Sequence, residues 1–504
     1  MSAAYDELIE RIKDASLLRT TGAILSWDQE TQMPPGGIQH RSRQFAKIAR
    51  LAHEHFTHAR IGELLDACEA DASLTADPQS DSAANLREIR RGYDRSTKLP
   101  PDLVAEMAQT TSVAHHHWQE ARKKNDFEMF RPWLEKNISL SRRVAECYGW
   151  AQDGEPWDAL AEGYEAGMRA KQIEKVFTPL RDRLQGLVTE LTSGKGKPSS
   201  TFASVVVPIE GQKAFVRDVA EQMGFDFERG RIDISAHPFC SGTNTGDVRI
   251  TTRYRDDGFA DSLAATMHEA GHGLYEQGLP PEHEGTPLGR YASLGIHESQ
   301  SRMWENFVGR SRAFWTWCGP RVRDALGAPV ASLSDDDMFE AMNAVIPSLI
   351  RVEADEATYN MHIMVRFELE RAMMSGDLDA AELPAEWNRR YKEYLGVDVP
   401  DDASGCMQDT HWSNAMFGYF PTYTLGNLYA AQIFEKARED IPDMDGSFEK
   451  GDFAPLKTWL NENVHMHGGR YRSAELCELV TGKPLSADPL LRHLESKLRP
   501  LYGV

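Results

Sequence analysis

The chain of 504 residues carries 77 acidic and 56 basic side chains, a net charge of −21, and 41% of its residues are hydrophobic. This balance is typical of a soluble globular protein with a large core, and it argues against nucleic acid as a partner, because phosphate binding needs a clustered basic surface. The start, MSAAYDELIERIKDASLL, lacks the apolar stretch of a secretory signal, and six scattered cysteines form no CxxC pair. We therefore expect free thiols in a cytoplasmic protein.

Most of the chain follows a helical spacing of apolar residues. In residues 5–28 the recurring positions are Leu8, Ile12, Ala15 and Leu18. Comparable spacing predicts helices at 131–150, 171–194 and 332–376.

Glycine and proline interrupt this pattern at three places. Gly194 and Gly376 predict helix ends, and Pro347 predicts a kink or a break within 332–376. Residues 192–202, TSGKGKPSSTF, are the best candidate for a linker, with a surface loop as an equal alternative.

A short β element interrupts the helices at about 230–255. RIDIS and DVRITT alternate polar and β-branched residues on either side of a region rich in Gly, Asn and Thr, which predicts two or three strands around a turn. We therefore expect a mainly α fold with a small sheet.

One long segment lacks charge. Residues 410–434, THWSNAMFGYFPTYTLGNLYAAQIF, contain no Asp, Glu, Lys or Arg and are long enough to cross a bilayer. The segment is nevertheless aromatic and carries His, Asn, Gln and Pro, which favours burial within the protein over contact with lipid. We expect no membrane association.

Directly after the β element, MHEAGHGLYEQG contains an HExxH pattern. On a helix, His268 and His272 share one face, so both imidazoles can reach one metal ion, and Glu269 lies beside the ion, where it can hold a water. A third ligand must come from elsewhere. The downstream candidates are Glu282, His283, Glu284, His297 and Glu298.

With these residues in hand, the sequence resembles the carboxypeptidase Taq family of zinc metallocarboxypeptidases over nearly its whole length. The shared motifs are HPF at 237, DVRIT at 247, HEAGH at 268, HESQ at 297, IRVEAD at 350, GCMQDTHW at 405 and GYFPTY at 418.

The resemblance implies zinc, or cobalt, held by His268, His272 and Glu298, with Glu269 as the general base. It also implies stepwise removal of C-terminal residues from peptides with a free C-terminus, and a homodimer. The implied fold is one catalytic domain over 1–504, with two helical lobes flanking a deep groove, like the neurolysin and angiotensin-converting-enzyme peptidases.

Further residues would complete the site. The uncharged segment supplies His411, Tyr419 and Tyr423 as donors to a developing oxyanion, and the family pattern favours the first two. A guanidinium matches a carboxylate with two parallel hydrogen bonds, so Arg351 and Arg249 are the candidates for the terminal carboxylate. We rank Arg351 first because in SLIRVEAD it directly follows an apolar run, which suits a charge that faces an enclosed cleft.

Several smaller expectations accompany this site. An Arg351–Asp355 ion pair on a helix surface is the alternative for Arg351. Asp355 is also a possible partner for a metal-bound histidine, and His237, on the small sheet, is a possible peptide contact.

Two other functions stay open. An endopeptidase or oligopeptidase on the same fold would cleave amidated and free C-termini equally. A non-catalytic helical binding protein is disfavoured, because Glu269 is intact and a structural zinc normally has four protein ligands.

Overall fold

The computed structural model describes residues 2–504, and the chain divides into two compact units. Unit 1 contains Met1–Thr97, Ser199–Met342 and Ala430–Pro484, and unit 2 contains Lys98–Pro198, Asn343–Tyr429 and Leu485–Val504. One crossing between the units, at Pro198–Ser199, falls inside the predicted linker at 192–202.

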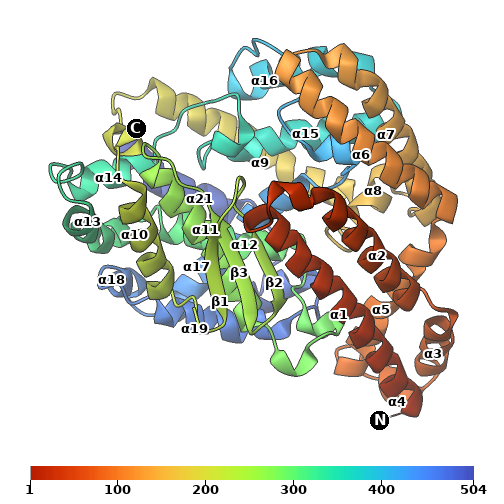
Figure 1. Ribbon diagram of the computed structural model, residues 1–504. Coiled ribbons are helices and arrows are strands. Elements are labelled where there is room, and N and C mark those ends of the chain that lie inside the picture. The colour runs from red at the N-terminus through yellow and green to blue at the C-terminus, as the bar shows by residue number, and fades with distance from the viewer. Residues whose placement is uncertain (1) are drawn as a thin grey trace. The chain divides into compact units, whose positions relative to one another are not determined.

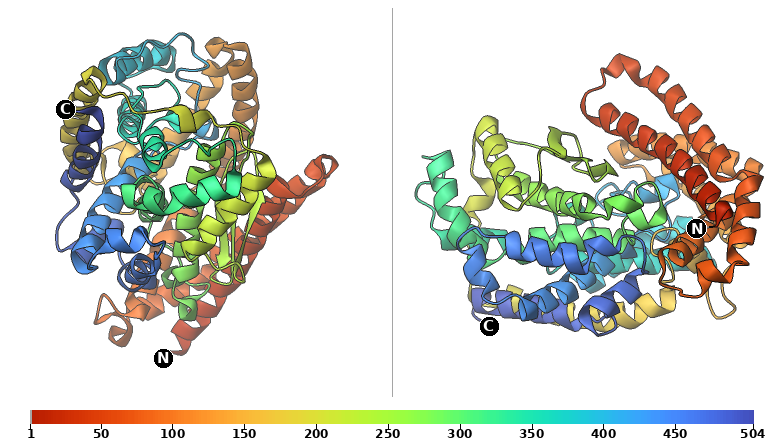
Figure 2. Two further views of the ribbon diagram at one scale, coloured as in Figure 1. Left: turned by 90° about the vertical axis from the view of Figure 1, so that its left-hand side faces the viewer. Right: turned by 90° about the horizontal axis from the view of Figure 1, so that it is seen from below.

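Unit 1 begins with a helical hairpin of α1 (Ala3–Thr31) and α2 (Ile38–Phe56), which run side by side in all views (Figures 1 and 2). The predicted period is borne out in α1, where Leu8 and Ile12 are buried against residues of α3 (Ala59–Glu69) and α5 (Asp81–Lys98).

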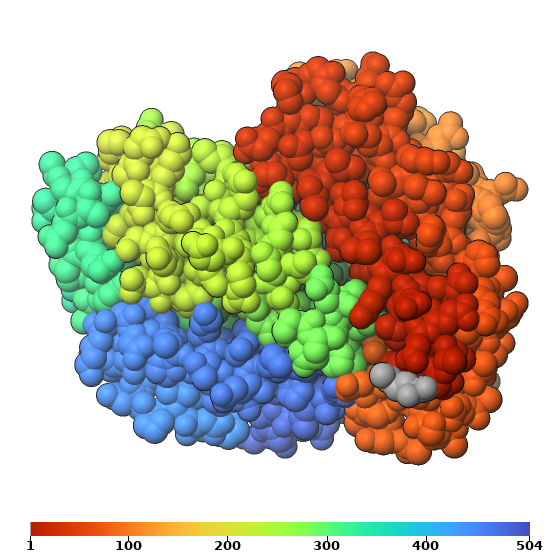
Figure 3. Space-filling view, turned by 60° about the horizontal axis from the view of Figure 1, so that its bottom comes forward, coloured from red at the N-terminus to blue at the C-terminus, as the bar shows by residue number. Residues whose placement is uncertain are grey.

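The remaining long helices of unit 1 come from its two later stretches. They are α10 (Ile209–Gln222), α11 (Phe259–Gly278), α12 (Leu294–Arg302), α13 (Arg312–Leu326), α14 (Asp335–Met342), α19 (Ala454–Asn463) and α20 (Ser473–Thr481). On the face in Figure 3, the early (red to orange), central (yellow-green to teal) and late (blue) stretches of unit 1 lie side by side. Unit 1 is thus assembled from sequence positions several hundred residues apart.

The small sheet has three strands, β1 (Gly230–Ile234), β2 (Cys240–Asn244) and β3 (Asp247–Thr252), in the order β1-β3-β2. β1 runs parallel and β2 antiparallel to the central β3. The sequence predicted strands at β1 and β3, but part of the supposed turn region is in fact β2. The small residues of β2 let the strand lie close to α11. A Cβ on Gly242 would lie 2.7 Å from a carboxylate oxygen of Glu276 on that helix.

Unit 2 contains α6 (Pro101–Lys124), α7 (Phe127–Tyr148), α8 (Pro156–Ala161), α9 (Ala170–Ser193), α15 (Tyr359–Ser375), α16 (Leu383–Leu395) and α21 (Asp488–Tyr502). α7 and α9 confirm the helices predicted at 131–150 and 171–194. α17 (Pro421–Asp440) begins in unit 2 and continues into unit 1.

The predicted helical region at 332–376 is broken rather than kinked. α14 ends at Met342 and α15 begins at Tyr359, with only a short 3₁₀ turn, η6 (Arg351–Glu353), between them. Pro347 disfavours helical backbone at Ile346, whose N–H donates instead to Asp355 at 3.0 Å. Arg351 is therefore not on a helix surface.

The uncharged segment lies almost entirely inside the protein. It forms the 3₁₀ turn η8 (His411–Asn414) and then enters α17, and nearly all its side chains are buried or half-buried. Among residues 2–504, no helix combines the length and the apolar character needed to cross a bilayer.

Candidate metal centre

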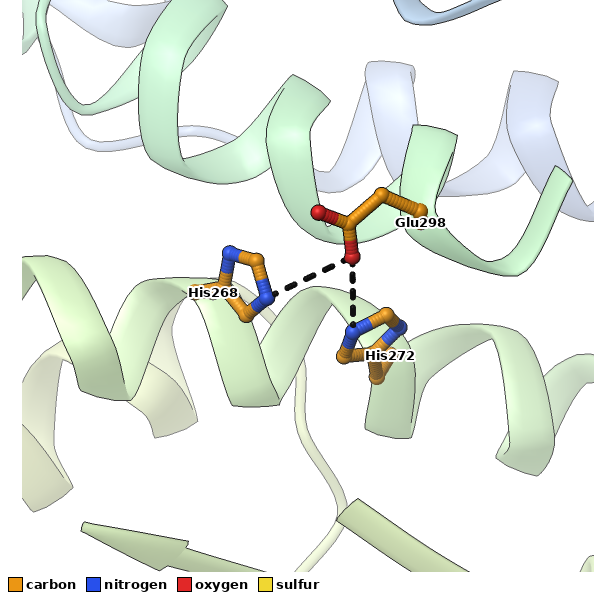
Figure 4. A group of neighbouring side chains, drawn as sticks. All are labelled: His268, His272 and Glu298. Atoms are coloured by element: carbon orange, nitrogen blue, oxygen red, sulfur yellow. Dashed lines mark ion pairs between the residues drawn. The ribbon is translucent and has the colours of Figure 1, made fainter. Parts of the chain in front are cut away.

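Two histidines and one glutamate converge from neighbouring helices of unit 1. His268 and His272 lie one turn apart on α11, and Glu298 lies on α12 (Figure 4). Glu298 Oε2 is 3.6 Å from His268 Nε2 and 3.4 Å from His272 Nε2. The sequence prediction that these three side chains come together is thus matched by the geometry.

The glycines on either side of His272 let α11 lie this close to its neighbours. A Cβ on Gly271 would be 2.7 Å from the carbonyl oxygen of Gln300 and 2.8 Å from Cα of Ser301, both on α12. A Cβ on Gly273 would be 2.5 Å from the ring of Phe225. Only glycine avoids both contacts, so the AGHG stretch sets the spacing that brings Glu298 to the histidines.

The outer nitrogen of each imidazole has its own partner. His268 Nδ1 is 2.8 Å from Glu305 Oε2, and His272 Nδ1 is 3.0 Å from the carbonyl oxygen of His297. A proton held on each Nδ1 leaves the Nε2 lone pairs pointing at Glu298. Burial lowers the pKa of His272 to about 3, which keeps this imidazole neutral.

These residues fit a divalent metal. One donor atom from each of the three side chains lies within 4.8 Å of the others. Two neutral imidazoles and a carboxylate form the donor set of His₂Glu zinc sites. Burial opposes ionisation of Glu298, but the neighbouring Arg302 guanidinium holds the pKa of its carboxyl well below the usual range, so the carboxylate is anionic.

Glu305 was missed by the sequence analysis, which proposed Asp355 as the partner of a metal-bound histidine. That proposal is wrong, because Asp355 accepts hydrogen bonds from Ile346, Ala357 and Thr358. Glu305 lies in the π-helical turn η5 (Met303–Val308) that continues α12. It is seven residues beyond Glu298, a spacing of about two turns that could have identified it.

Glu269 has the properties of a base. Its side chain is buried, and Oε2 has no hydrogen-bond partner among residues 2–504. Burial raises the pKa of its carboxyl to about 7, while His268 lowers it and Glu298 raises it further. A carboxyl with a pKa near neutrality can both accept and return a proton.

Three of the other candidates for the third ligand have partners of their own. His297 stacks on His272 with ring centroids 4.3 Å apart, and its Nε2 is 3.0 Å from Glu276 Oε1. Glu284 accepts a hydrogen bond from Asn244, and His283 Nε2 is 3.6 Å from Asp81.

Unit 2 holds a second group of buried charges around Asp409. Arg351 Nε and Nη2 donate to Asp409 Oδ1 at 3.0 and 2.8 Å, and Arg366 Nε donates to Oδ2 at 2.7 Å. The two guanidiniums hold the pKa of the Asp409 carboxyl far below its usual range, against the effect of burial. Arg351 therefore pairs with Asp409, and the alternative pairing with Asp355 is wrong.

The proposed oxyanion donors lie beside this cluster. His411 Nε2 is 3.3 Å from the hydroxyl of Tyr423, and the ring centroid of Tyr419 is 5.2 Å from that of His411. The Arg351 guanidinium lies over the Tyr423 ring, 4.9 Å from its centroid. Burial, with Arg351 and Arg366, lowers the pKa of His411 to about 4, although Asp409 raises it, so the imidazole is neutral near pH 7.

Arg249 and His237 lie in unit 1 with different surroundings. Arg249 makes two hydrogen bonds of 2.8 Å to Asp247 and stacks over Trp27 of α1, 4.3 Å from the ring. It is therefore committed to holding α1 against β3. His237 is exposed and lies in the connection between β1 and β2 rather than on a strand.

Comparisons with known proteins agree with this architecture. The model of the carboxypeptidase Taq (M32) metallopeptidase family matches residues 7–498. The thermostable carboxypeptidase 1 of Thermus thermophilus is 45% identical over 99% of both chains, and carboxypeptidase 1 of Bacillus subtilis is 36% identical over 98% of both. The crystal structure of an M32 carboxypeptidase from Deinococcus radiodurans superimposes with a TM-score of 0.96 at 39% identity and covers 100% of both chains.

Matches of this extent cover the metal centre and the arginine cluster alike. The chain therefore belongs to the carboxypeptidase Taq (M32) family and is a metallocarboxypeptidase that hydrolyses peptides.

Proposed function

We propose that the chain removes single residues from the C-termini of peptides with broad specificity. In this proposal His268, His272 and Glu298 hold a zinc ion, for which cobalt can substitute, and Glu269 is the general base. Arg351 binds the terminal carboxylate, and His411 and Tyr419, with Tyr423 behind them, serve the oxyanion. The observation that carries the proposal is the buried, unpartnered Oε2 of Glu269 next to a ligand of the three-residue centre.

The first step is proton transfer by Glu269. A divalent ion in the centre would polarise the scissile carbonyl and lower the pKa of a bound water. Glu269 Oε2 takes the proton of the attacking water as the new C–O bond forms, and the carbonyl oxygen then carries the negative charge. Glu269 passes the proton to the leaving amine as the C–N bond breaks and the carbonyl re-forms.

The negative charge that develops on the carbonyl oxygen needs donors in addition to the metal. His411 is neutral near pH 7 and buried, so its N–H is a hydrogen-bond donor in a site of low dielectric. The hydroxyl of Tyr419 is a second donor. Tyr423 contacts both the His411 imidazole and the Arg351 guanidinium, which supports a positioning role.

The arginine cluster has the charge needed to bind a carboxylate. Arg351 and Arg366 share the single carboxylate of Asp409, so the hydrogen-bonded trio carries one net positive charge. Arg351 uses three of its five N–H groups on Asp409 and Tyr359. The two that remain, one on each terminal nitrogen, can donate in parallel to a peptide carboxylate.

Arg249 remains the second candidate for binding the terminal carboxylate. To do so, its guanidinium would have to leave Asp247 and Trp27. His237 stays a possible contact of the peptide chain because it is exposed. We further propose that the two units act as one catalytic domain, since the metal residues and the carboxylate anchor are divided between them.

The substrate distinguishes this function from that of an endopeptidase. Matched peptides with a free and an amidated C-terminus would be incubated with the zinc-loaded protein, and the products followed by mass spectrometry. We expect single residues to leave the free peptide in succession and the amidated peptide to be cleaved at least about 30-fold more slowly, the lower end of the effect of losing one partner of a buried charge pair. Equal cleavage of both would favour the endopeptidase.

Cellular location and assembly are also part of the proposal. We propose that the protein is a cytoplasmic homodimer. The scattered cysteines support the compartment, and the likeness to the family supports the dimer. Light scattering of the purified chain at several concentrations would test the dimer directly.

A further inference from the structure

Glu370 is a buried acid of unit 2 that the proposed mechanism does not use. It lies on α15 with no exposed surface. Its carboxylate accepts three N–H hydrogen bonds: Oε1 from Trp412 Nε1 at 3.0 Å, and Oε2 from Trp157 Nε1 at 3.1 Å and from the backbone of Gly418 at 2.9 Å. Burying an ionised carboxylate costs free energy, and the three N–H donors offset part of that cost while fixing their own positions around Glu370.

Two of the three donors belong to the segment that carries the proposed oxyanion residues. Trp412 directly follows His411, and Gly418 directly precedes Tyr419. One carboxylate therefore fixes the chain beside each of these residues. The third donor, Trp157, comes from α8 and is not part of this segment.

Regular secondary structure does not hold the segment between these residues. It consists of a single 3₁₀ turn, after which Ala415 and Gly418 have positive φ angles of 53° and 90°. A Cβ on Gly418 would lie 2.7 Å from the backbone nitrogen of Ala161, so the chain passes close to α8 there. A backbone of this kind depends on side-chain anchors for its shape.

The charge of Glu370 suits an anchor. Burial raises the pKa of its carboxyl to about 7, while the N–H donors of Trp412, Gly418 and Trp157 lower it. The ionised carboxylate accepts all three hydrogen bonds, whereas a carboxamide would present an NH₂ group to at least one donor. Arg366, one turn earlier on α15, donates hydrogen bonds to Gln408 and Asp409.

We propose that Glu370 is a positioning residue for the hydrolysis, which holds His411 and Tyr419 together in the arrangement that stabilises the oxyanion. This inference rests on the proposed roles of those two residues. It predicts that loss of the carboxylate lowers the chemical rate without weakening metal binding or substrate capture.

The direct test is Glu370→Gln. We expect kcat to fall roughly 10- to 100-fold, the effect of a displacement of about 1 Å in a catalytic group, with zinc content and KM close to those of the parent. A kcat within about twofold of the parent in a folded Glu370→Gln protein would overturn the inference.

A matched pair keeps the inference falsifiable if that variant does not fold. Trp412→Phe and Trp157→Phe each remove one indole N–H from Glu370 and keep a buried ring, but only the first releases the segment. We expect Trp412→Phe to lower kcat at least about fivefold more than Trp157→Phe. Equal effects would overturn the inference.

Combined variants separate positioning from general stability. If Glu370 acts through His411 and Tyr419, Glu370→Gln should change kcat less than about twofold in the His411→Ala, Tyr419→Phe background. The same fold-loss there as in the parent would overturn the inference. If the background itself had the parent's kcat, the proposed oxyanion roles would fail, and the inference with them.

Discussion

The metal centre of unit 1 and the arginine cluster of unit 2 are built in opposite ways. The centre brings three donor atoms, two from imidazoles and one from a carboxylate, within 4.8 Å of one another. In the cluster, the carboxylate of Asp409 is already paired with the guanidiniums of Arg351 and Arg366. The first arrangement fits a divalent cation, and the second is the proposed binding site of the peptide carboxylate.

The sites also differ in how the chain reaches them. All three metal ligands lie within a stretch of 31 residues, from His268 to Glu298, on two consecutive long helices. Arg351, Arg366 and Asp409 come from a 3₁₀ turn, a helix and an irregular loop. The two histidines of such a metal site can be recognised from a local motif, and the third ligand lies close enough in the chain to be among a few candidates. A charge cluster of this kind appears only when distant segments meet.

The largest expected effect breaks the chemistry of the metal centre alone. In Glu269→Gln the side chain keeps its shape and loses its ability to accept a proton, so kcat should fall about 10²- to 10⁴-fold. Zinc content, measured by atomic emission, should match that of the parent because Glu269 is not a ligand. Parent-like hydrolysis of an acylated dipeptide would contradict the assignment.

The next effect concerns the arginine cluster alone. Arg351→Ala removes the proposed anchor and leaves Asp409 paired with Arg366, so kcat/KM for peptides with a free C-terminus should fall roughly 30-fold or more. Zinc content should not change, and amidated peptides should lose little.

Arg351→Lys is the matched control for this variant. It keeps the charge without the planar fork, and its kcat/KM should fall between those of the parent and Arg351→Ala. Unchanged turnover of free peptides by Arg351→Ala would remove Arg351 from the site.

A smaller effect tests the support of the metal ligands. Glu305→Gln weakens the acceptor for His268 Nδ1, so zinc affinity should fall about 10- to 100-fold in competition with a chelator. Arg351→Ala is the control from the other region and should keep the parent's affinity. A parent-like affinity in Glu305→Gln would show that His268 needs no such partner.

The smallest effect tests the spacing between α11 and α12. Gly271→Ala places a Cβ against the backbone of Gln300 and Ser301 and should destabilise the protein by about 1–3 kcal/mol, measured by urea unfolding. Gly186→Ala on α9 is the control, since nothing lies within 4 Å of a Cβ there, and it should stabilise the helix by up to about 1 kcal/mol. Equal behaviour of the two variants would mean that the helices can separate freely.

Sequence patterns predicted the parts of the protein whose structure is local. The helical period gave α1, α7 and α9, and the HExxH spacing gave one face of α11. The alternation of β-branched residues predicted β1 and β3. The expectation of two or three strands allowed for β2, but its small polar residues resemble a turn and did not locate it. Short-range patterns succeed where the neighbours along the chain decide the structure.

The sequence alone determined that His268 and His272 share one face of a helix with Glu269 beside them, because a helix fixes the relative direction of residues one turn apart. Tertiary structure decided which acids complete the two sites. Glu305 rather than Asp355 supports His268, and Asp409 rather than Asp355 pairs with Arg351. These choices depend on where separate helices and loops pack, and the energy of a buried charge is set by the groups that surround it in space, which a one-dimensional pattern does not contain.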